Sequence, residues 1–482
     1  MHWGYAFQVI GAVLAFIGLT MLLPLAYSVS VADGLWPVFL FSSCLTSGFG
    51  LVLYSLLRSS RVEVMSHRVG MAVVTLSWIG AGVFGSLPLY LSGYFAHFSD
   101  CVFETFSGFT TTGASICTNV EILPHSLLLW RSLTHWLGGM GIILLSLAVL
   151  PFLGIGGMQL YRAEVPGPVP DKLRPRIRDT ALLLWKVYVL FTVLEIILLY
   201  SGGMELFDAV CHTFGTMATG GFSTKNGSIG HYSSAYLQMV VTVFMVIAGT
   251  NFALHFKMLQ GHIRGFREDP EFRFYGGLIL AGTLILTLMV WGHTEDGVWT
   301  AFRHSLFQVV SILTTTGYAT ADFELWGPLA QMMLLGAMFV GGCAGSTSGG
   351  IKCMRILILV KQAGRELLRL VHPRAIVSLR LGARTVSDEM LQGIVGFLVL
   401  YLLLACLSIG ALAALEVDVL TSISAVIACI SNIGPGLGSV GPTENYSQIP
   451  ILGKWVLIFC MLLGRLEIYT VVILLAPWFW RK

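Results

Sequence analysis

Long apolar stretches separated by shorter polar segments dominate the chain. A helix that crosses a bilayer needs about 20 mostly apolar residues. Stretches of that length run over residues 5–27, 36–57, 70–93, 125–152, 180–201, 233–256, 274–293, 328–360, 390–415 and 449–478. The first follows only Met1 and His2, without basic residues in front, so we expect a spanning helix there rather than a cleaved signal. The pattern predicts an all-α polytopic membrane protein with ten spans.

The composition supports lipid as the solvent of much of this chain. Of the 482 residues, 56% are hydrophobic and only 11% are charged, whereas soluble domains carry about 25% charged residues. The mean hydropathy is +0.81. The nine cysteines show neither a CxxC pair nor metal-ligand spacing, so we expect no disulfide or zinc framework.

Charged residues divide between alternate loops. The basic clusters are Arg58, Arg61 and Arg68; Arg162, Lys172, Arg174, Arg176 and Arg178; Lys257, Arg264, Arg267 and Arg273; Lys352, Arg355, Lys361, Arg365, Arg369, Arg374, Arg380 and Arg384; and Arg481 and Lys482. The positive-inside rule assigns these loops and both termini to the cytoplasm. The intervening loops hold Asp33, Asp100, Glu205, Asp208, Glu295, Asp296, Glu416, Asp418 and Glu444. We therefore expect an acidic outer face that concentrates cations, and no nucleic-acid partner.

The outer connections 94–124, 202–232, 294–327 and 416–448 are too long for turns and too apolar for solvent. Each holds an apolar run followed by a Thr/Gly or Asn/Gly element. The runs are Cys101–Phe109, Phe207–Met217, Val298–Leu313 and Val419–Ile430. At about 1.5 Å per residue such runs reach only partway across a bilayer, which is typical of re-entrant half-helices. Acidic residues near their starts suit the positive end of a helix dipole.

The order span, half-helix, glycine loop, span occurs four times. The loop glycines, at positions 113, 220, 317 and 434, are separated by 107, 97 and 117 residues. Such repetition predicts a pseudo-fourfold ring of M1–half-helix–filter–M2 repeats around one pore. The expected units are an N-terminal transmembrane hairpin over 1–69 and pore repeats over 70–178, 179–272, 273–384 and 385–482.

The glycine loops have the composition of a cation filter. A dehydrated potassium ion needs about eight oxygens, which rings of backbone carbonyls supply without a fixed charge, and glycine permits the required backbone angles. The expected filter residues are Thr111, Thr112, Gly113, Ala218, Thr219, Gly220, Thr315, Thr316, Gly317, Ser431, Asn432, Ile433 and Gly434. A single Thr-Thr-Gly is more typical of a helix-terminating turn. Four such loops in corresponding places favour the filter.

A second motif, residues 341–350, lies in the eighth span. It contains Gly341, Gly342, Gly345, Ser346, Thr347, Ser348, Gly349 and Gly350. These residues are poor helix formers, so the helix should break within the membrane and supply a flexible gate. Small-residue helix packing is the alternative. The motif also resembles a phosphate-binding loop, but its Lys is one position late and no strand precedes it.

Arg465 lies deep in the last span, where a charge should face the protein interior and mark function. An ion pair with Glu467 is one interpretation, although residues two apart point to different helix faces. The interpretation we prefer is that Arg465 donates to carbonyls freed in the 341–350 loop and holds that loop across the pore. Four further polar residues could line the pore, although each is more typical of a satisfied helix-packing group: His135, Asn251, His255 and Gln308.

At the filter loops and the 341–350 segment the chain resembles the TrkH/TrkG/KtrB superfamily of potassium transporters. The resemblance covers nearly the whole chain and is closest to the bacterial TrkH-type uptake subunit, because of the extra N-terminal hairpin. Its most specific elements are Thr111–Ala114, Ala218–Phe222, Thr315–Tyr318 and Asn432–Pro435, joined to the Gly-Ser-Thr-Ser-Gly-Gly-Ile-Lys run at 345–352.

The resemblance implies potassium in the filter, no organic cofactor in this chain, and a homodimer with one pore per subunit in the bacterial inner membrane. It also implies a gating loop, an arginine that contacts it (Arg465 matches), and a cytosolic TrkA-type ring that binds NAD or ATP/ADP and contacts the basic loops. In related plant transporters a serine at the first filter glycine goes with sodium preference. All four filter positions here are glycine, which favours potassium, although the Thr-Val-Gly-Tyr-Gly signature of tetrameric channels is absent.

Three functional hypotheses follow. The first is potassium uptake, by a channel or a symport mechanism, under the control of the soluble partner. The second is a cation-coupled secondary transporter that binds substrate at the broken eighth helix, although such proteins usually show two related halves. The third, an intramembrane enzyme, is not expected, because the spans hold no acidic pair, metal-ligand cluster or Ser/His arrangement.

Overall fold

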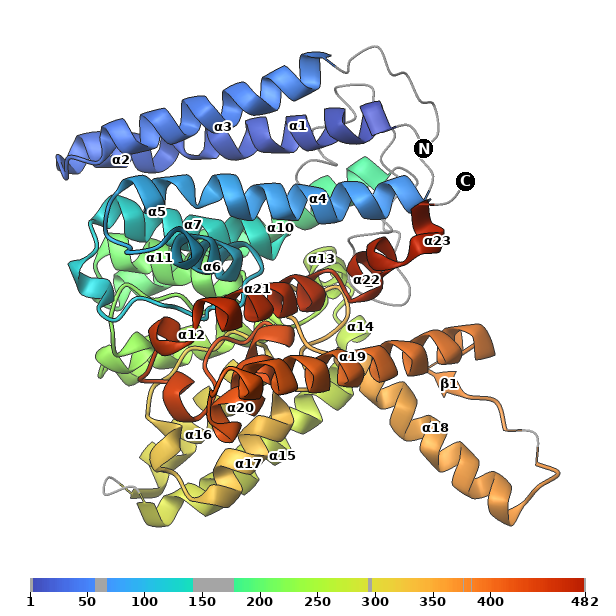
Figure 1. Ribbon diagram of the computed structural model, residues 1–482. Helices are drawn as coiled ribbons and strands as arrows, with labels where there is room; N and C mark the ends of the chain where they lie inside the picture. The colour runs from blue at the N-terminus through green and yellow to red at the C-terminus, as the bar shows by residue number, and fades with distance from the viewer. Residues whose placement is uncertain are drawn as a thin grey trace.

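The computed structural model describes residues 3–56, 67–141, 177–293, 297–375, 377–382 and 384–480. Figure 1 shows a helical bundle with one short β-hairpin near α18. The long helices are α1 (Trp3–Thr20), α2 (Leu22–Val31), α3 (Trp36–Leu56), α4 (His67–Gly85), α7 (His125–Gly139), α10 (Ile177–Ser201), α12 (Ala235–Ala248), α15 (Pro270–Val290), α17 (Pro328–Ala337), α18 (Cys353–Val371), α19 (Asp388–Ala414) and α21 (Ile451–Arg465). The half-helices are α6 (Phe98–Phe109), α11 (Leu206–Met217), α16 (Gly297–Leu313) and α20 (Val419–Ile430).

Short elements connect these helices. They are α5 (Leu87–Leu91), η1 (Val120–Ile122), η3 (Ser228–His231), α13 (Phe252–Leu259), α14 (Arg264–Glu268), η4 (Trp291–His293), η5 (Phe323–Leu325), β1 (Arg380–Leu381), β2 (Arg384–Thr385), η6 (Gly438–Val440), η7 (Tyr446–Gln448), α22 (Tyr469–Leu475) and α23 (Pro477–Trp480). Strands β1 and β2 pair antiparallel between α18 and α19. The predicted charged positions Arg58, Arg61, Arg162, Lys172, Arg174, Arg176, Glu295, Asp296, Arg481 and Lys482 lie outside the described residues.

The N-terminal helices form a tight hairpin that packs along α4 (Figure 1). Small residues permit the close approach, because a Cβ on Gly11 would lie 2.6 Å from the carbonyl oxygen of Gly50. Ser43 Oγ donates to Gly18 O at 2.7 Å across the same interface. Close packing of small residues is the usual way in which helices associate in lipid.

The half-helices end where the sequence predicts. Their last residues, Phe109, Met217, Leu313 and Ile430, are the predicted ones. Acidic residues also occupy the predicted N-terminal ends within the described chain. Asp100 and Asp208 lie in first turns, and Asp418 accepts a hydrogen bond from Thr421 N at 2.9 Å as the cap of α20.

The expectation of uninterrupted spans is wrong for the second helices of the second and fourth repeats. Among the described residues, six helices are long and apolar enough to cross a membrane. Helices α12 and α13, which bend by 100° at their break, make a seventh if the pair is counted as one span. The predicted span 449–478 divides into α21 and α22, and Glu467 and Ile468 between them have positive φ of 54° and 56°. The predicted span 125–152 is described only as far as residue 141, and its helix ends at Gly139.

The break predicted in the eighth span is confirmed. Helix α17 ends at Ala337 and α18 begins only at Cys353. Helix α18 then leaves the bundle, as Figure 1 shows in orange. The fold is therefore the predicted all-α membrane architecture, with helix breaks in more repeats than the sequence suggested.

Candidate functional site

All four half-helices end in the same turn. The second residue after each helix, Thr111, Thr219, Thr315 or Asn432, has a left-handed backbone with φ between 54° and 56°. The N–H of the next residue donates to the carbonyl five positions back: Thr112 to Ser107 at 2.9 Å, Gly220 to Gly215 at 2.8 Å, Thr316 to Ser311 at 2.9 Å and Ile433 to Ala428 at 2.8 Å. This is the Schellman arrangement of a helix C-terminus. Each loop is thus a helix-terminating turn, and the four turns are equivalent.

The second loop has a different register from the one that we predicted. Two residues after the left-handed position, each loop has a glycine with positive φ: Gly113 at 78°, Gly221 at 83°, Gly317 at 79° and Gly434 at 101°. Gly221, not Gly220, is therefore the counterpart of the other three glycines. Gly220 corresponds instead to Thr112, Thr316 and Ile433. The Gly-Gly pair made the two registers indistinguishable in the sequence.

The four loops meet in a closed ring. A Cβ on any of these four glycines would come within 3.0 Å of a carbonyl oxygen of another loop. Gly113 faces Gly220 O, Gly221 faces Thr316 O, Gly317 faces Ile433 O and Gly434 faces Thr112 O. Each loop thus touches the next in chain order and the fourth returns to the first. Only a glycine permits both this approach and the positive φ.

A cavity of about 130 Å³ opens beside the ring, and all four glycines line it. Its wall includes the outer-loop residues Glu444 and Asn445, so it is the outer vestibule of the predicted topology. A neighbouring recess of about 460 Å³ is lined by Glu324, Asp418 and Glu444. Burial raises the pKa of Glu324, as do Asp322 and Glu444, against the opposing hydrogen bond from Gly438 N–H. Acidic residues thus line a recess next to the vestibule, and Glu444 belongs to both.

The hydroxyl groups of the loops bond to neighbouring hydroxyls. Thr110 with Thr112, and Thr314 with Thr316, pair their hydroxyls at 2.8 Å. Ser431 Oγ lies 2.7 Å from Tyr401 OH. The contacts between the predicted filter loops are therefore made mainly by their backbones. Ala218 and Ser431 each lie one position before the residue of their loop that has the left-handed backbone, Thr219 and Asn432.

His135 braces the second loop from behind. Its Nδ1 lies 2.8 Å from Gly108 O, and its Nε2 accepts the N–H of Phe222 at 3.2 Å. A carbonyl only accepts and a backbone N–H only donates, so the ring carries its proton on Nδ1. A Cβ on Gly220 would lie 2.5 Å from the imidazole ring, which explains the extra glycine of this loop. His135 is thus a packing group, as are Asn251, which caps α13, and His255, which bonds Ile247 O.

A buried ion pair that sequence reasoning missed braces the first loop. Arg131 Nη2 lies 2.6 Å from Glu104 Oε1, and both side chains are almost completely buried. Glu104 also accepts Ser115 Oγ and Ile116 N, each at 2.9 Å, just after the filter loop. The Arg131 guanidinium lies 4.2 Å from the centre of the Phe222 ring in the second loop. A charged residue inside a predicted span, the signal that identified Arg465, could have identified Arg131.

The 341–350 loop crosses beneath the ring, on the side away from the vestibule. Thr347 Oγ1 donates to Met217 O at 3.1 Å and to Ala248 O at 3.2 Å, both in the second repeat. Gly349 N donates to Thr315 Oγ1 at 2.7 Å, and a Cβ on Gly349 would lie 2.9 Å from Asn432 Cβ. The loop therefore contacts the second, third and fourth filter turns directly.

The broken helix of the second repeat supplies further contacts to this loop. Cys343 N donates to Gly249 O at 2.9 Å, and Phe252 N donates to Gly345 O at 3.0 Å. Freed backbone groups at membrane depth need partners within the protein. The backbone groups freed at the break between α12 and α13 form hydrogen bonds with those of the 341–350 loop. This break is therefore part of the surface on which the loop docks.

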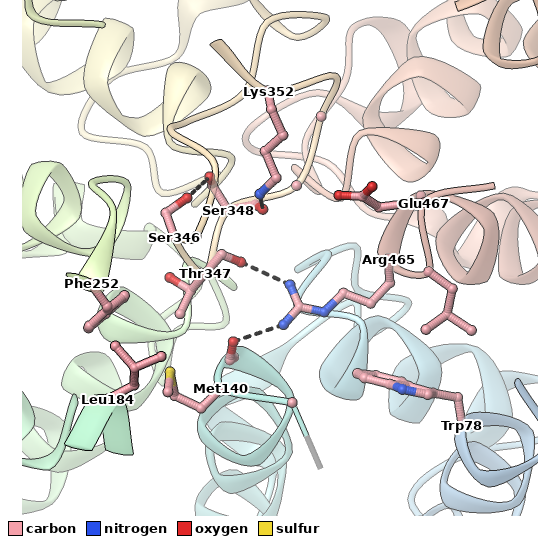
Figure 2. A pocket seen from close by; sticks show the side chains of 17 residues that line it. Trp78, Met140, Leu184, Phe252, Ser346, Thr347, Ser348, Lys352, Arg465 and Glu467 are labelled. Carbon is pink, nitrogen blue, oxygen red and sulfur yellow. Dashed lines mark hydrogen bonds between the residues drawn. The ribbon is translucent and has the colours of Figure 1, made fainter. Parts of the chain in front are cut away.

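Arg465 completes the arrangement from the last span, as Figure 2 shows. Its Nη1 donates to Thr347 O at 2.9 Å and to Thr111 Oγ1 at 3.2 Å, and its Nη2 donates to Gly138 O and, at 2.9 Å, to Gly139 O. The preferred prediction for Arg465, donation to carbonyls of the 341–350 loop, is confirmed. Glu467 forms its ion pair with Arg355 of α18. The guanidinium joins the loop to the C-terminal end of α7 in the first repeat, which the sequence did not suggest.

Comparisons with known proteins agree with this arrangement. The family model described as "TrkH: Cation transport protein" matches residues 37–482. The chain is 43% identical over 479 residues to the Trk system potassium uptake protein TrkH of Halomonas elongata, covering 98% of each chain. It is 40% identical over 486 residues to the protein of the same name from Escherichia coli, covering all of both.

A solved structure is similar over its whole length. The crystal structure of the potassium transporter TrkH from Vibrio parahaemolyticus matches with a TM-score of 0.90 and 38% identity, covering 100% of both chains. The family model and the relatives span nearly all of the sequence, and the structural match includes the ring and the loop beneath it. The chain belongs to the TrkH family of cation transport proteins.

Proposed function

We propose that this protein takes up potassium ions across the bacterial inner membrane through the ring of four loops. The observation that carries the proposal is the closed order of contacts, Gly113 to Gly220, Gly221 to Thr316, Gly317 to Ile433 and Gly434 to Thr112. Such a ring places equivalent backbone segments of one chain around one axis. Stacked carbonyl oxygens from these segments replace the water shell of a potassium ion.

The half-helices and the acidic mouth support the same function. The C-terminal ends of four helices, which carry partial negative charge, point toward the ring and favour a cation. Glu324, Asp418 and Glu444 raise the local concentration of cations at the vestibule. The relatives named above are potassium uptake proteins, and the chain matches them from end to end.

The 341–350 loop acts as the gate of this pathway. It lies beneath the filter turns and is held by Arg465, so an ion leaving the filter meets a closed backbone. Opening requires these hydrogen bonds to break together. Helix α18 follows the loop directly and leaves the bundle, so it is suited to transmit a signal from outside the membrane.

The resemblance of the sequence supports a homodimer and a cytosolic TrkA-type ring that binds NAD or ATP/ADP. In this proposal both termini and the basic residues of α18 face the cytoplasm. Lys361 and Arg369 on α18 are exposed and would meet the partner there. The chain itself binds potassium as cargo and needs no organic cofactor.

A cation-coupled secondary transporter that binds substrate at the broken eighth helix is the alternative. The four equivalent turns favour the filter instead, because they match a ring of four and not a pair of halves. Moreover, the segment that would bind a substrate is occupied by contacts to the filter turns.

Growth of a potassium-uptake-deficient bacterium tests the proposal. The wild-type chain should restore growth at low potassium, and Gly113→Ser should restore it less well or make growth sensitive to sodium. Gly203→Ala is a matched control, because Gly203 has φ of 90° but no atom within 4 Å of the position of its Cβ. Equal growth with the wild-type chain and with empty vector would contradict the proposal.

A further inference from the structure

The fourth filter glycine differs from the other three in its carbonyl group. Tyr446 OH donates to Gly434 O at 2.6 Å. Within the part of the chain that the structure describes, the carbonyl oxygens of Gly113, Gly221 and Gly317 accept no hydrogen bond. Gly434 also has the largest φ of the four, 101° against 78°, 83° and 79°. The ring is therefore fourfold in its backbone contacts but not in its free glycine oxygens.

Tyr446 is held in place by contacts with the first repeat. Its exposed fraction is 2%, and it is the first residue of η7, in the outer connection that follows the fourth loop. Its backbone N–H donates to Ser115 O at 2.8 Å, and the centre of its ring lies 5.5 Å from that of Phe103. These contacts fix the phenol whether or not its hydroxyl is bonded. The hydroxyl therefore has a defined place from which it reaches the Gly434 carbonyl.

The Gly434 carbonyl is the preferred acceptor of this hydroxyl. The thiol of Cys429, on α20, also lies beside the hydroxyl. Sulfur is a weak acceptor, whereas a backbone carbonyl is a strong one with two lone pairs. The phenol therefore donates to Gly434 O and occupies one of its two lone pairs.

A second tyrosine at the ring bonds differently. Tyr318 OH donates to His212 O at 3.0 Å and to Phe222 O at 3.1 Å. These acceptors lie in the half-helix α11 and one residue beyond the glycine of the second loop, so Tyr318 braces that loop and leaves its glycine oxygen free. Gly434 and Tyr446, by contrast, both line the vestibule. The bond between them therefore acts on the layer of glycine oxygens next to the vestibule.

We propose that Tyr446 is a positioning residue that draws the Gly434 carbonyl away from the ion, so that this layer binds potassium with three free glycine oxygens and releases it readily. This inference rests on the proposed function. Conduction requires that each site bind the ion well enough to admit it and weakly enough to let it leave. Because one of four oxygens is shared with the phenol, the affinity at the entrance is lowered and passage is faster. Tyr446 acts through the carbonyl and needs no contact with the ion.

The concentration dependence of potassium flux into liposomes that contain the purified full chain tests this proposal. Tyr446→Phe removes only the hydroxyl and keeps the ring against Phe103, so it frees the Gly434 carbonyl. The potassium concentration that gives half-maximal flux should fall several-fold, and the maximal flux should fall with it. A tyrosine that merely supports the fold would give the opposite shift, a higher half-saturating concentration, because the filter would loosen. Tyr236→Phe is the matched control: Tyr236 OH donates to Leu198 O at 3.3 Å, outside the filter loops, and its removal should leave both values unchanged.

The outcomes separate the two proposals. If the half-saturating concentration of Tyr446→Phe equals or exceeds that of a wild-type protein that conducts potassium selectively, the role of Tyr446 is wrong and the proposed function stands. If no protein, including wild type, conducts potassium, the proposed function fails and this inference fails with it. Where Tyr446→Phe does not remain monodisperse in size-exclusion chromatography, Tyr446→Met applies the same test, because it also lacks the donor and its flexible side chain adapts to the site. A half-saturating concentration at or above that of wild type in Tyr446→Met would then overturn the inference.

Discussion

Arg465 Nη1 lies 2.9 Å from the carbonyl oxygen of Thr347, and this hydrogen bond joins the last span to a loop 118 residues earlier in the chain. The same guanidinium reaches Gly139 O at 2.9 Å in the first repeat. One side chain therefore connects three of the four repeats directly beneath the filter. A planar group with several donors is suited to this role.

Replacement of Arg465 should open the gate. Each hydrogen bond from a charged group contributes about 1.5–3 kcal/mol, and about 1.4 kcal/mol changes an equilibrium tenfold. Arg465→Ala should therefore raise potassium flux in liposomes roughly tenfold or more. Arg465→Lys, which keeps the charge but loses the planar fork, should give an intermediate flux. Unchanged flux in Arg465→Ala would remove the arginine from the gate.

The register of the second filter loop gives a separate prediction. Gly221→Ala places a Cβ against Thr316 O, as Gly113→Ala does against Gly220 O, so both variants should lose selective potassium flux. Gly220→Ala instead meets the His135 ring. Its main effect should be a lower melting temperature, which removal of the imidazole in Gly220→Ala/His135→Ala should partly reverse. If Gly220→Ala and Gly113→Ala were alike in flux and stability while Gly221→Ala resembled wild type, Gly220 would be the filter glycine, as the sequence predicts.

The Glu104–Arg131 pair should be necessary for stability. Removal of one partner from a buried pair costs about 3–5 kcal/mol, because the remaining charge has no partner. Arg131→Met should therefore lower the melting temperature of the purified protein in detergent. Glu104→Gln/Arg131→Met, which leaves no buried charge, should be more stable than Arg131→Met alone. If the double variant were less stable than both Arg131→Met and Glu104→Gln, the ion pair would not be the main contribution of these two residues to stability.

Cation entry should depend on pH through the mouth of the ring. A carboxylate attracts cations only while it is ionised, and burial raises the pKa of Glu324 above its ordinary value. As the pH falls toward that raised pKa, the charge is lost and potassium flux should fall. Glu324→Gln should show lower flux at neutral pH and a flatter profile, and the difference should shrink at high salt because the field is screened. Identical pH profiles in both proteins would exclude Glu324 from cation attraction.

Much of this architecture is readable from the sequence because lipid imposes simple rules. Apolar length located the spans, and every half-helix ends at its predicted residue, for example at Phe109 and Ile430. Small and polar residues at 341–350 identified a break, because they are poor helix formers in a segment otherwise long enough to span. The deep position of Arg465 identified it as an interior group.

Other features depend on contacts between repeats and could not be predicted. The Gly220-Gly221 pair allows two registers, and only the close approach of Thr316 O and the His135 ring selects one. The break after Ala248 is stabilised by the 341–350 loop, a partner far away in the chain. Arg131 was overlooked although its charge lies in an apolar span, and its ion pair with Glu104 became evident only from the fold.

The relative flux of potassium and sodium into liposomes that contain only the purified chain tests the central claim most directly. If backbone carbonyls of the four loops select the ion, Arg465→Ala, whose gate is open, should conduct potassium much faster than sodium. Adding Gly113→Ser to this variant should bring the two rates closer together. Equal potassium and sodium rates in Arg465→Ala, unaffected by Gly113→Ser, would contradict the account.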